Sequence, residues 1–297
     1  MTIGVIGLGL IGGSIGQSLR SQRHRVIGHD PLPAHVEIAR QRYCVDEIGS
    51  LEQFGECEVV FLAVPPSSVT SVADDLRPHV PTTTVVTDVA SVKAQIVTWA
   101  ETADWPTFVP GHPMAGHEKS GPAYSSDWMF RGAKWLITPT ARTEANAVKL
   151  VSGLVTQMGA APIVMDAREH DARVALMSHV PHILSAQLLL QAFRKAGSDV
   201  GGGSWRDWSR VAGVDPDLWT QICIENRAAI THELRSLSGE LGALVTALEA
   251  EDAAAVRKLF QRAAEIKASM KPEPTGPDAM QRAAGSRAAT GKGGRRR

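Results

Sequence analysis

The chain has 297 residues, which is enough for two domains with a sizeable core, and its 31 basic and 31 acidic side chains balance. Its three cysteines have no paired spacing, so they fit neither a disulfide framework nor a zinc site and indicate a reducing cytoplasm. The apolar start of the chain is interrupted by glycines and lacks a charged leader. It is therefore expected to be neither a signal peptide nor a membrane span.

The N-terminal stretch predicts a dinucleotide-binding unit. A β-branched strand (Thr2–Ile6) runs directly into the pattern Gly-x-Gly-x-x-Gly and then into an expected helix (Ser14–Arg20). The first glycine allows a tight turn, the second lets a pyrophosphate approach the backbone, and the third lets helix and strand pack closely. We therefore expect cofactor contacts from Gly7, Leu8, Gly9, Leu10, Ile11 and Gly12.

A second strand (Arg25–Gly28) leads to Asp30, at the place where dinucleotide-binding units carry an acidic residue about 20 residues after the glycines. A carboxylate here can accept hydrogen bonds from both ribose hydroxyls of an adenosine and would repel the extra phosphate of NADP. The alternative, a turn residue before Pro31, is weaker after a complete glycine pattern. The sequence therefore predicts NAD as the cofactor.

Alternating strands and helices continue to about residue 165. Further strands are expected at Val59–Val64, Thr83–Thr87, Phe108–Val109, Leu136–Thr138 and Pro162–Val164, with a helix at Thr143–Met158. This alternation predicts an α/β fold with a doubly wound dinucleotide-binding sheet over residues 1–165. The continuous apolar run that ends near residue 64 is typical of a strand covered on both faces. Additional cofactor contacts are expected where it stops, from Val64, Pro65 and Ser67.

Residues Pro110–Gly121 hold two histidines, a glutamate and a lysine among three glycines and two prolines. Glycine and proline at this density exclude a helix or a central strand, so the segment is expected to be a shaped loop. It follows Phe108–Val109, and we expect it at the carboxyl end of a strand, where open α/β sheets bind ligands. It is a candidate reaction centre; the alternative is a turn with solvated charges.

After residue 165 the helical period predicts an all-α domain at residues 166–270. Asp215–Pro216 is typical of a helix start, because a capping residue precedes a proline. Two apolar stripes indicate either an internal bundle or a dimer interface: Leu234, Leu237, Leu241, Leu244 and Leu248, and Val256, Leu259, Phe260 and Ala263. Residues 271–297 are basic and without periodicity, so a disordered tail is favoured over a nucleic-acid site.

Five segments together resemble the prephenate and arogenate dehydrogenases of tyrosine biosynthesis, and they occur in the order Gly7–Gly16, Asp88–Lys93, His112–Gly116, Ser178–His182 and Gly201–Trp219. The resemblance covers about residues 1–270. It implies a Rossmann-type domain, a helical domain through which the chain forms a homodimer, and the NAD-dependent oxidative decarboxylation of prephenate to 4-hydroxyphenylpyruvate. Arogenate, which would yield tyrosine, is the alternative substrate.

The resemblance assigns the role of proton acceptor to His112, with Ser91 orienting the same substrate hydroxyl. A neutral histidine suits this step because its pKa can lie near the working pH. For Ser91, the alternative is the N-cap of a helix. The same resemblance places Arg210 on the ring carboxylate, with Arg206 one turn before it, and an arginine can hold a carboxylate through two parallel hydrogen bonds.

Other substrate contacts are expected from His117, Glu118, His179, His182 and Trp219. His179 and His182 lie on one face of a helix expected at Asp171–Leu190. No third metal ligand lies near these two histidines in the sequence, and hydride chemistry needs no metal, so a metal site is not expected. For each histidine, the alternative to a substrate contact is a buried ring hydrogen-bonded to the backbone. His117 stands where many members of the family have threonine or another small residue, which leaves the choice between prephenate and arogenate open.

Two other classes of protein remain possible from the residues. A β-hydroxyacid or imine reductase shares the architecture, but it would need a catalytic lysine or a different helix motif in place of His112 and Arg210. A non-catalytic NAD-binding regulator would keep the glycines and have no use for that histidine–arginine pair.

Overall fold

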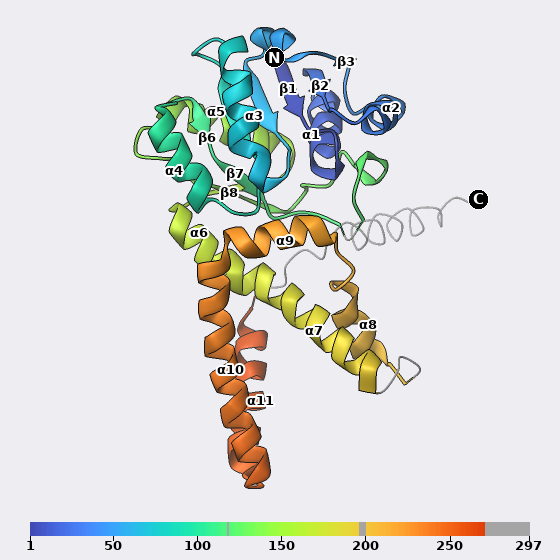
Figure 1. The fold of residues 1–297 in the computed structure, drawn as a ribbon, viewed down its shortest axis with the longest axis vertical. Coiled ribbons are helices and arrows are strands. Elements are labelled where there is room, and N and C mark those ends of the chain that lie inside the picture. The colour runs from blue at the N-terminus through green and yellow to red at the C-terminus, as the bar shows by residue number, and fades with distance from the viewer. Residues whose placement is uncertain (118, 196–199, 271–297) are drawn as a thin grey trace, which may run out of the picture. The chain divides into compact units, whose positions relative to one another are not determined.

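The computed structural model describes residues 1–117, 119–195 and 200–270 (Figure 1). The predictions for Glu118 and for the tail at residues 271–297 concern positions outside the described residues. The chain divides into two compact units, residues 1–230 and residues 231–297. In the part of the chain that the structure describes, none of the helices combines the length and the apolar character of a membrane span.

Six parallel strands form the main sheet, in the order β3-β2-β1-β4-β5-β6. They are β1 (Thr2–Ile6), β2 (Arg25–His29), β3 (Glu47–Ile48), β4 (Val59–Leu62), β5 (Val85–Asp88) and β6 (Phe108–Val109). The chain order reverses between β1 and β4, and open sheets bind their ligands at the carboxyl ends of the strands beside such a reversal. The predicted doubly wound α/β fold is confirmed.

Helices cover both faces of this sheet, and each face has its own apolar core. Residues of α1 (Leu10–Ser21) and α5 (Ala145–Gln157) pack in one core. Residues of α3 (Val69–Leu76) and α4 (Ala94–Ala103) pack in the other. The helix α2 (Pro33–Gln41) follows β2 and is mostly exposed. Every residue of β4 is buried, as its continuous apolar sequence predicts.

A second sheet has three strands, in the order β7-β8-β9. They are β7 (Gly111–Pro113), β8 (Lys134–Ile137) and β9 (Ala161–Val164). The prediction that Pro110–Gly121 is a loop throughout is therefore wrong for its first part, where His112 pairs with Leu136 in an antiparallel ladder. Proline is tolerated because β7 lies at the edge of the sheet, where the backbone N–H that proline lacks is not needed for hydrogen bonds on both sides of the strand.

From Ala167 onwards the described residues form helices and no strand. The helices are α6 (Ala167–Val174), a π-helical segment (Ala175–His179), α7 (Val180–Lys195), α8 (Gly203–Arg210), α9 (Pro216–Glu225), α10 (Arg227–Glu249) and α11 (Ala253–Ser269). The helix predicted to start at Asp171 starts earlier, because Asp166 accepts hydrogen bonds from two backbone N–H groups and caps it. The π-helical segment then changes the helical register directly before His182, and such segments are frequent at functional sites.

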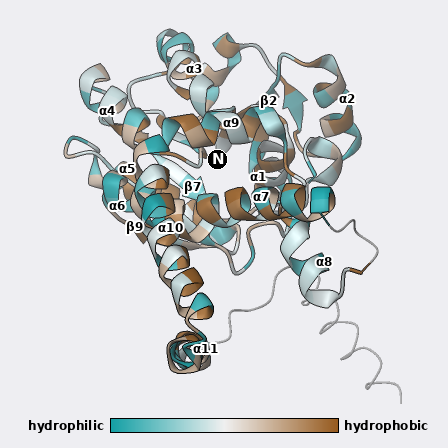
Figure 2. Ribbon diagram, turned by 60° about the horizontal axis from the view of Figure 1, so that its bottom comes forward, coloured by the Kyte–Doolittle hydropathy of each residue, from teal (hydrophilic) through white to brown (hydrophobic). Residues whose placement is uncertain are grey.

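The apolar stripe predicted on residues 234–248 lies on α10, and the stripe on residues 256–263 lies on α11. No leucine of the first stripe is buried, and Leu241 and Leu248 are 50% and 56% exposed. On α11, Leu259 and Phe260 are exposed as well. Figure 2 shows the hydrophobic residues along α10. Leu241, Leu248, Leu259 and Phe260 therefore stay exposed among the described residues, which argues against an internal bundle.

Candidate active site

The glycine pattern forms the turn between β1 and α1. Gly7 has φ of +90°, and a side chain there would also meet the backbone oxygen of Ala63 at 2.3 Å. A side-chain carbon on Gly12 would lie 1.8 Å from the backbone oxygen of Gly7, so only glycine permits this helix–strand contact. Gly9 instead faces open space, with nothing within 4 Å of such a carbon. The open space lies at the start of α1, where free N–H groups and the helix dipole favour a phosphate.

Asp30 follows β2 and is fixed beside this turn. Its Oδ2 accepts the N–H of Leu8 over 2.7 Å, and its Oδ1 accepts the N–H of Leu32 over 2.8 Å. His35 lies on the same carboxylate, with Nδ1 3.2 Å from Oδ2. The carboxylate is thus oriented by the glycine turn itself, in the place from which such groups bind an adenosine ribose.

The end of β4 completes the cofactor edge of the sheet. The side chain of Val64 would contact a carbon added to Gly7 at 3.2 Å, so it borders the glycine turn. Pro65 leads into a short 3₁₀ turn (Pro66–Ser68), where the Ser67 hydroxyl donates to Gln221 of α9 over 2.8 Å. NAD fits this arrangement of an open glycine turn, an adjacent carboxylate and the end of β4. The residues predicted from the sequence as cofactor contacts would hold it.

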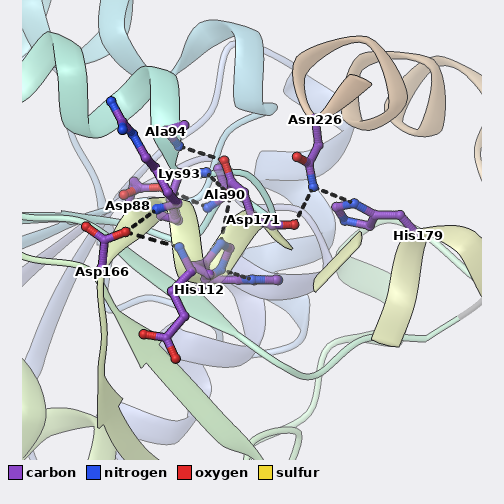
Figure 3. Close-up of polar contacts among 12 residues, drawn as sticks. Asp88, Ala90, Lys93, Ala94, His112, Asp166, Asp171, His179 and Asn226 are labelled. Carbon is purple, nitrogen blue, oxygen red and sulfur yellow. Dashed lines mark hydrogen bonds and ion pairs between the residues drawn. The ribbon is translucent and has the colours of Figure 1, made fainter. Parts of the chain in front are cut away.

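His112 lies on β7 and is only 8% exposed. Its Nδ1 is 2.9 Å from His170 Nε2, and His170 Nδ1 is 2.8 Å from Asp171 Oδ1 (Figure 3). Burial holds the pKa of His112 well below its ordinary value, and the neighbouring His170, Lys93 and His179 lower that pKa further. His112 is therefore a neutral imidazole at neutral pH.

A buried ion pair lies next to His112, in the turn between β5 and α4. Lys93 Nζ contacts Asp88, and both side chains are fully buried. The carboxylate of Asp88 also accepts the N–H of Ala90 over 2.9 Å and the N–H of Gly111 over 3.2 Å, so this pair holds β7 in place. Ser91 lies half-buried in the same turn. It does not cap α4, because Lys93 occupies the N-cap position.

The other two predicted histidines meet at Trp219. The ring of His182 stacks on that of Trp219 with centroids 4.1 Å apart, and the ring of His179 meets it edge-on at 6.0 Å. Asn226 donates from Nδ2 to the backbone oxygen of Asp171 over 2.8 Å and lies 3.2 Å from His179 Nδ1. Asn226 thereby ties His179 to the turn of α6 that carries His170 and Asp171.

The sequence matches two family models, over residues 15–164 for "Prephenate dehydrogenase, nucleotide-binding domain" and over residues 166–262 for "Prephenate dehydrogenase, dimerization domain". Together the two models cover most of the chain. The chain belongs to the prephenate dehydrogenase family.

Relatives of known name agree with this assignment. The chain is 29% identical to the prephenate dehydrogenase of Bacillus subtilis over 279 residues, which is 90% of this chain and 75% of that protein. It is similar to the solved structure of Aquifex aeolicus prephenate dehydrogenase in complex with hydroxyphenyl propionate and NAD+, with TM-score 0.81 and 29% identity over 90% of this chain and 96% of that one. It is also similar to Synechocystis arogenate dehydrogenase, with TM-score 0.78 and 30% identity over 90% and 99%. The chain is thus an NAD-dependent oxidoreductase of the prephenate dehydrogenase family.

Within this dehydrogenase, the two predicted arginines lie on α8 and are exposed. The Ser185 hydroxyl donates to the backbone oxygen of Trp208 over 2.6 Å, which joins the end of α8 to the turn of α7 after His182. Arg210 is the last residue of α8, and Arg206 lies one turn earlier. His117 is exposed, and its ring stacks on that of Tyr124 with centroids 6.1 Å apart.

Three polar residues of this dehydrogenase site were missed by the sequence analysis: His170, Asp171 and Asn226. His170 and Asp171 fall in a charged run at a helix start, which is typical of a solvated first turn, and Asn226 lies between two helices. All three are buried. Since burial depends on what packs over a residue, no pattern within the sequence separates these side chains from solvated ones.

Proposed function

We propose that the chain catalyses the NAD-dependent oxidative decarboxylation of prephenate to 4-hydroxyphenylpyruvate. The observation that carries this proposal is His112, a buried neutral base on β7, which follows directly after β6 of the sheet that holds the glycine turn. Its Nδ1 is held by His170, whereas its Nε2 has no hydrogen-bond partner among the described residues, and the residue is 8% exposed. A base held in this way can accept a proton from a bound substrate.

The reaction needs few groups from the protein. NAD, when bound, supplies the acceptor for the hydride that leaves C4 of the substrate ring. His112 takes the C4 hydroxyl proton, and it returns this proton to the phenolate oxygen formed when carbon dioxide leaves the ring. Ser91, at the turn after β5, is proposed to orient the same hydroxyl. Arg210 and Arg206 are proposed to bind the ring carboxylate, because charge-assisted hydrogen bonds from guanidinium groups favour carboxylates.

His179 is proposed to donate a hydrogen bond to a substrate oxygen. The amide of Asn226 donates toward its Nδ1, so the proton of the neutral ring lies on Nε2. Burial lowers the pKa of His179 to about 4, which keeps the ring neutral at neutral pH. Its Nε2 is buried without a partner, and an unsatisfied buried donor costs about 1–3 kcal/mol. A substrate carbonyl or carboxylate oxygen would satisfy it, with His182 and Trp219 forming the wall of the pocket.

Arogenate is the second candidate substrate, favoured by the similarity to the Synechocystis arogenate dehydrogenase. The two substrates differ only in the side chain, keto in prephenate and amino in arogenate. His117 is proposed to lie near this side chain and to decide between the two substrates. The test is to incubate the purified protein with NAD and either prephenate or arogenate in parallel, and to follow NADH absorbance. Turnover of neither compound would contradict the proposed function.

Asp30 predicts the choice of cofactor. We expect Asp30→Ser combined with Leu32→Arg to shift the ratio of kcat/KM for NAD over NADP toward NADP by roughly tenfold or more, about 1.4 kcal/mol. The change removes a negative charge, and it places a guanidinium on an exposed residue whose N–H contacts Asp30. Each single variant serves as a control, because both changes are needed. A native protein that already prefers NADP would contradict this assignment.

We propose domains at residues 1–165 and 166–270, and a homodimer formed through the second, since its family model is described as a dimerization domain. The protein is proposed to act in the cytoplasm.

Replacing Leu241 and Leu248 with glutamate should lower the mass in solution from dimer to monomer at micromolar concentration, because charges would enter an apolar interface. Light scattering measures this mass, and Glu240→Gln, an exposed change on the same helix, is the matched control. A monomeric native protein would contradict the interface.

A further inference from the structure

We infer that His170 and Asp171 are positioning residues that set the tautomer of His112, so that its ring keeps the lone pair on Nε2. The use of that lone pair rests on the proposed function. The chain of hydrogen bonds itself stands on the geometry, because Asp171, His170 and His112 are joined in series through contacts of 2.8 and 2.9 Å (Figure 3).

The two hydrogen bonds that join Asp171, His170 and His112 can run in one direction only. An ionised carboxylate has no proton to give, so His170 donates from Nδ1 to Asp171 Oδ1. A neutral His170 then carries its lone pair on Nε2, and this lone pair accepts the Nδ1 proton of His112. With its single proton on Nδ1, a neutral His112 presents Nε2 as a proton acceptor.

The surroundings keep both rings neutral. Burial lowers the pKa of His170 even though Asp171 raises it, and burial also lowers the pKa of His112. A second positive charge is disfavoured because Lys93 already stands close to both rings. The ionisable groups around the two rings are Asp88, Lys93, Asp171 and His179.

Asp171 is held rigidly as the acceptor at the end of the chain. Its Oδ1 accepts the N–H of Lys93 over 2.8 Å and its Oδ2 accepts the N–H of Ala94 over 2.9 Å, at the start of α4. Burial raises the pKa of Asp171, but the hydrogen bonds from His170 and from these backbone groups lower it below its ordinary value. Asp171 therefore stays ionised at neutral pH, and its position is determined by α4 as well as by α6.

The first experiment reads the tautomer without any substrate. Long-range ¹H–¹⁵N spectra of the full-length protein at neutral pH distinguish a ring nitrogen that bears a proton from one that bears a lone pair. The signal of His112 is assigned by its loss in His112→Asn. We expect the proton on Nδ1; a proton on Nε2 overturns the inference.

The second experiment separates positioning from simple support of the fold. His170→Leu removes the acceptor at similar volume, and His170→Gln keeps an amide oxygen within reach of His112. We expect His170→Leu to mix the two tautomers of His112 and to lower kcat by roughly 10- to 100-fold with KM nearly unchanged, and His170→Gln to restore most of both properties.

The outcomes distinguish this inference from the proposed function. Unchanged kcat and tautomer in His170→Leu would overturn the positioning role, as would a loss in His170→Gln equal to that in His170→Leu. Thermal unfolding of each variant shows whether the fold persists, and if His170→Leu does not fold, the spectrum of the native protein still decides. Absence of turnover with either substrate would remove the proposed function and leave the tautomer result intact.

Discussion

His112→Asn should lower kcat by about 10²–10⁴ with KM nearly unchanged, because asparagine keeps the size and a hydrogen-bonding group but cannot accept a proton. The native ring is neutral, buried and held through Nδ1, so the lost function is that of the base at Nε2. Steady-state rates of NADH formation at saturating NAD measure the effect. The matched control is His79→Asn, which changes a histidine in the turn before β5, at the amino end of the strands.

The same base predicts the pH dependence of the native enzyme. Only neutral His112 can accept the proton, so kcat/KM should be lost as pH falls through its pKa. Because burial lowers that pKa well below the ordinary value of 6.5, activity should persist below pH 6.5 before it declines. This acid limb should be absent in His112→Asn. Near-native turnover of that variant, or an acid limb that survives in it, would remove His112 from the mechanism.

The acid limb has to be measured where the protein is folded. A histidine with a depressed pKa binds fewer protons in the folded than in the unfolded state, so stability falls as pH drops below about 6.5. Circular dichroism at each pH therefore accompanies the rates. A decline in rate that follows unfolding would not report on His112.

Arg210→Gln should raise KM for the substrate by a factor on the order of 10–100, with a smaller change in kcat. Glutamine loses the charge-assisted contact with a carboxylate, which corresponds to roughly 1.5–3 kcal/mol of binding free energy. Arg210 is exposed at the end of α8, so the substitution should leave the fold and its thermal stability unchanged. Substrate titrations at saturating NAD measure KM.

A matched variant for this arginine is Arg194→Gln, which removes the same charge from an exposed position near the end of α7. It should leave KM unchanged, whereas a general effect of net charge on an anionic substrate would raise KM in both variants. An unchanged KM in Arg210→Gln would remove Arg210 from the binding site.

Local sequence determined the cofactor half of the molecule. The glycine turn, the strand before it and the acidic residue after the second strand lie within about 30 residues, and each role follows from short-range geometry. Gly7 must be glycine because its φ is positive, and Gly12 because the backbone of Gly7 approaches it at that point. The helix start at Asp215 follows equally from one capping residue.

Contacts between distant segments decided the rest of the site. His112 is a strand residue because Gly111–Pro113 pairs with the edge of β8. In that pairing His112 lies opposite Leu136, which is 24 residues further along the chain. His170 and Asp171 became buried partners of His112 because β7 and the start of α4 close over the first turn of α6. The sequence of a charged helix start does not show which segments will pack over it. Desolvation shifts a pKa and strengthens a hydrogen bond, and it depends on the surrounding fold.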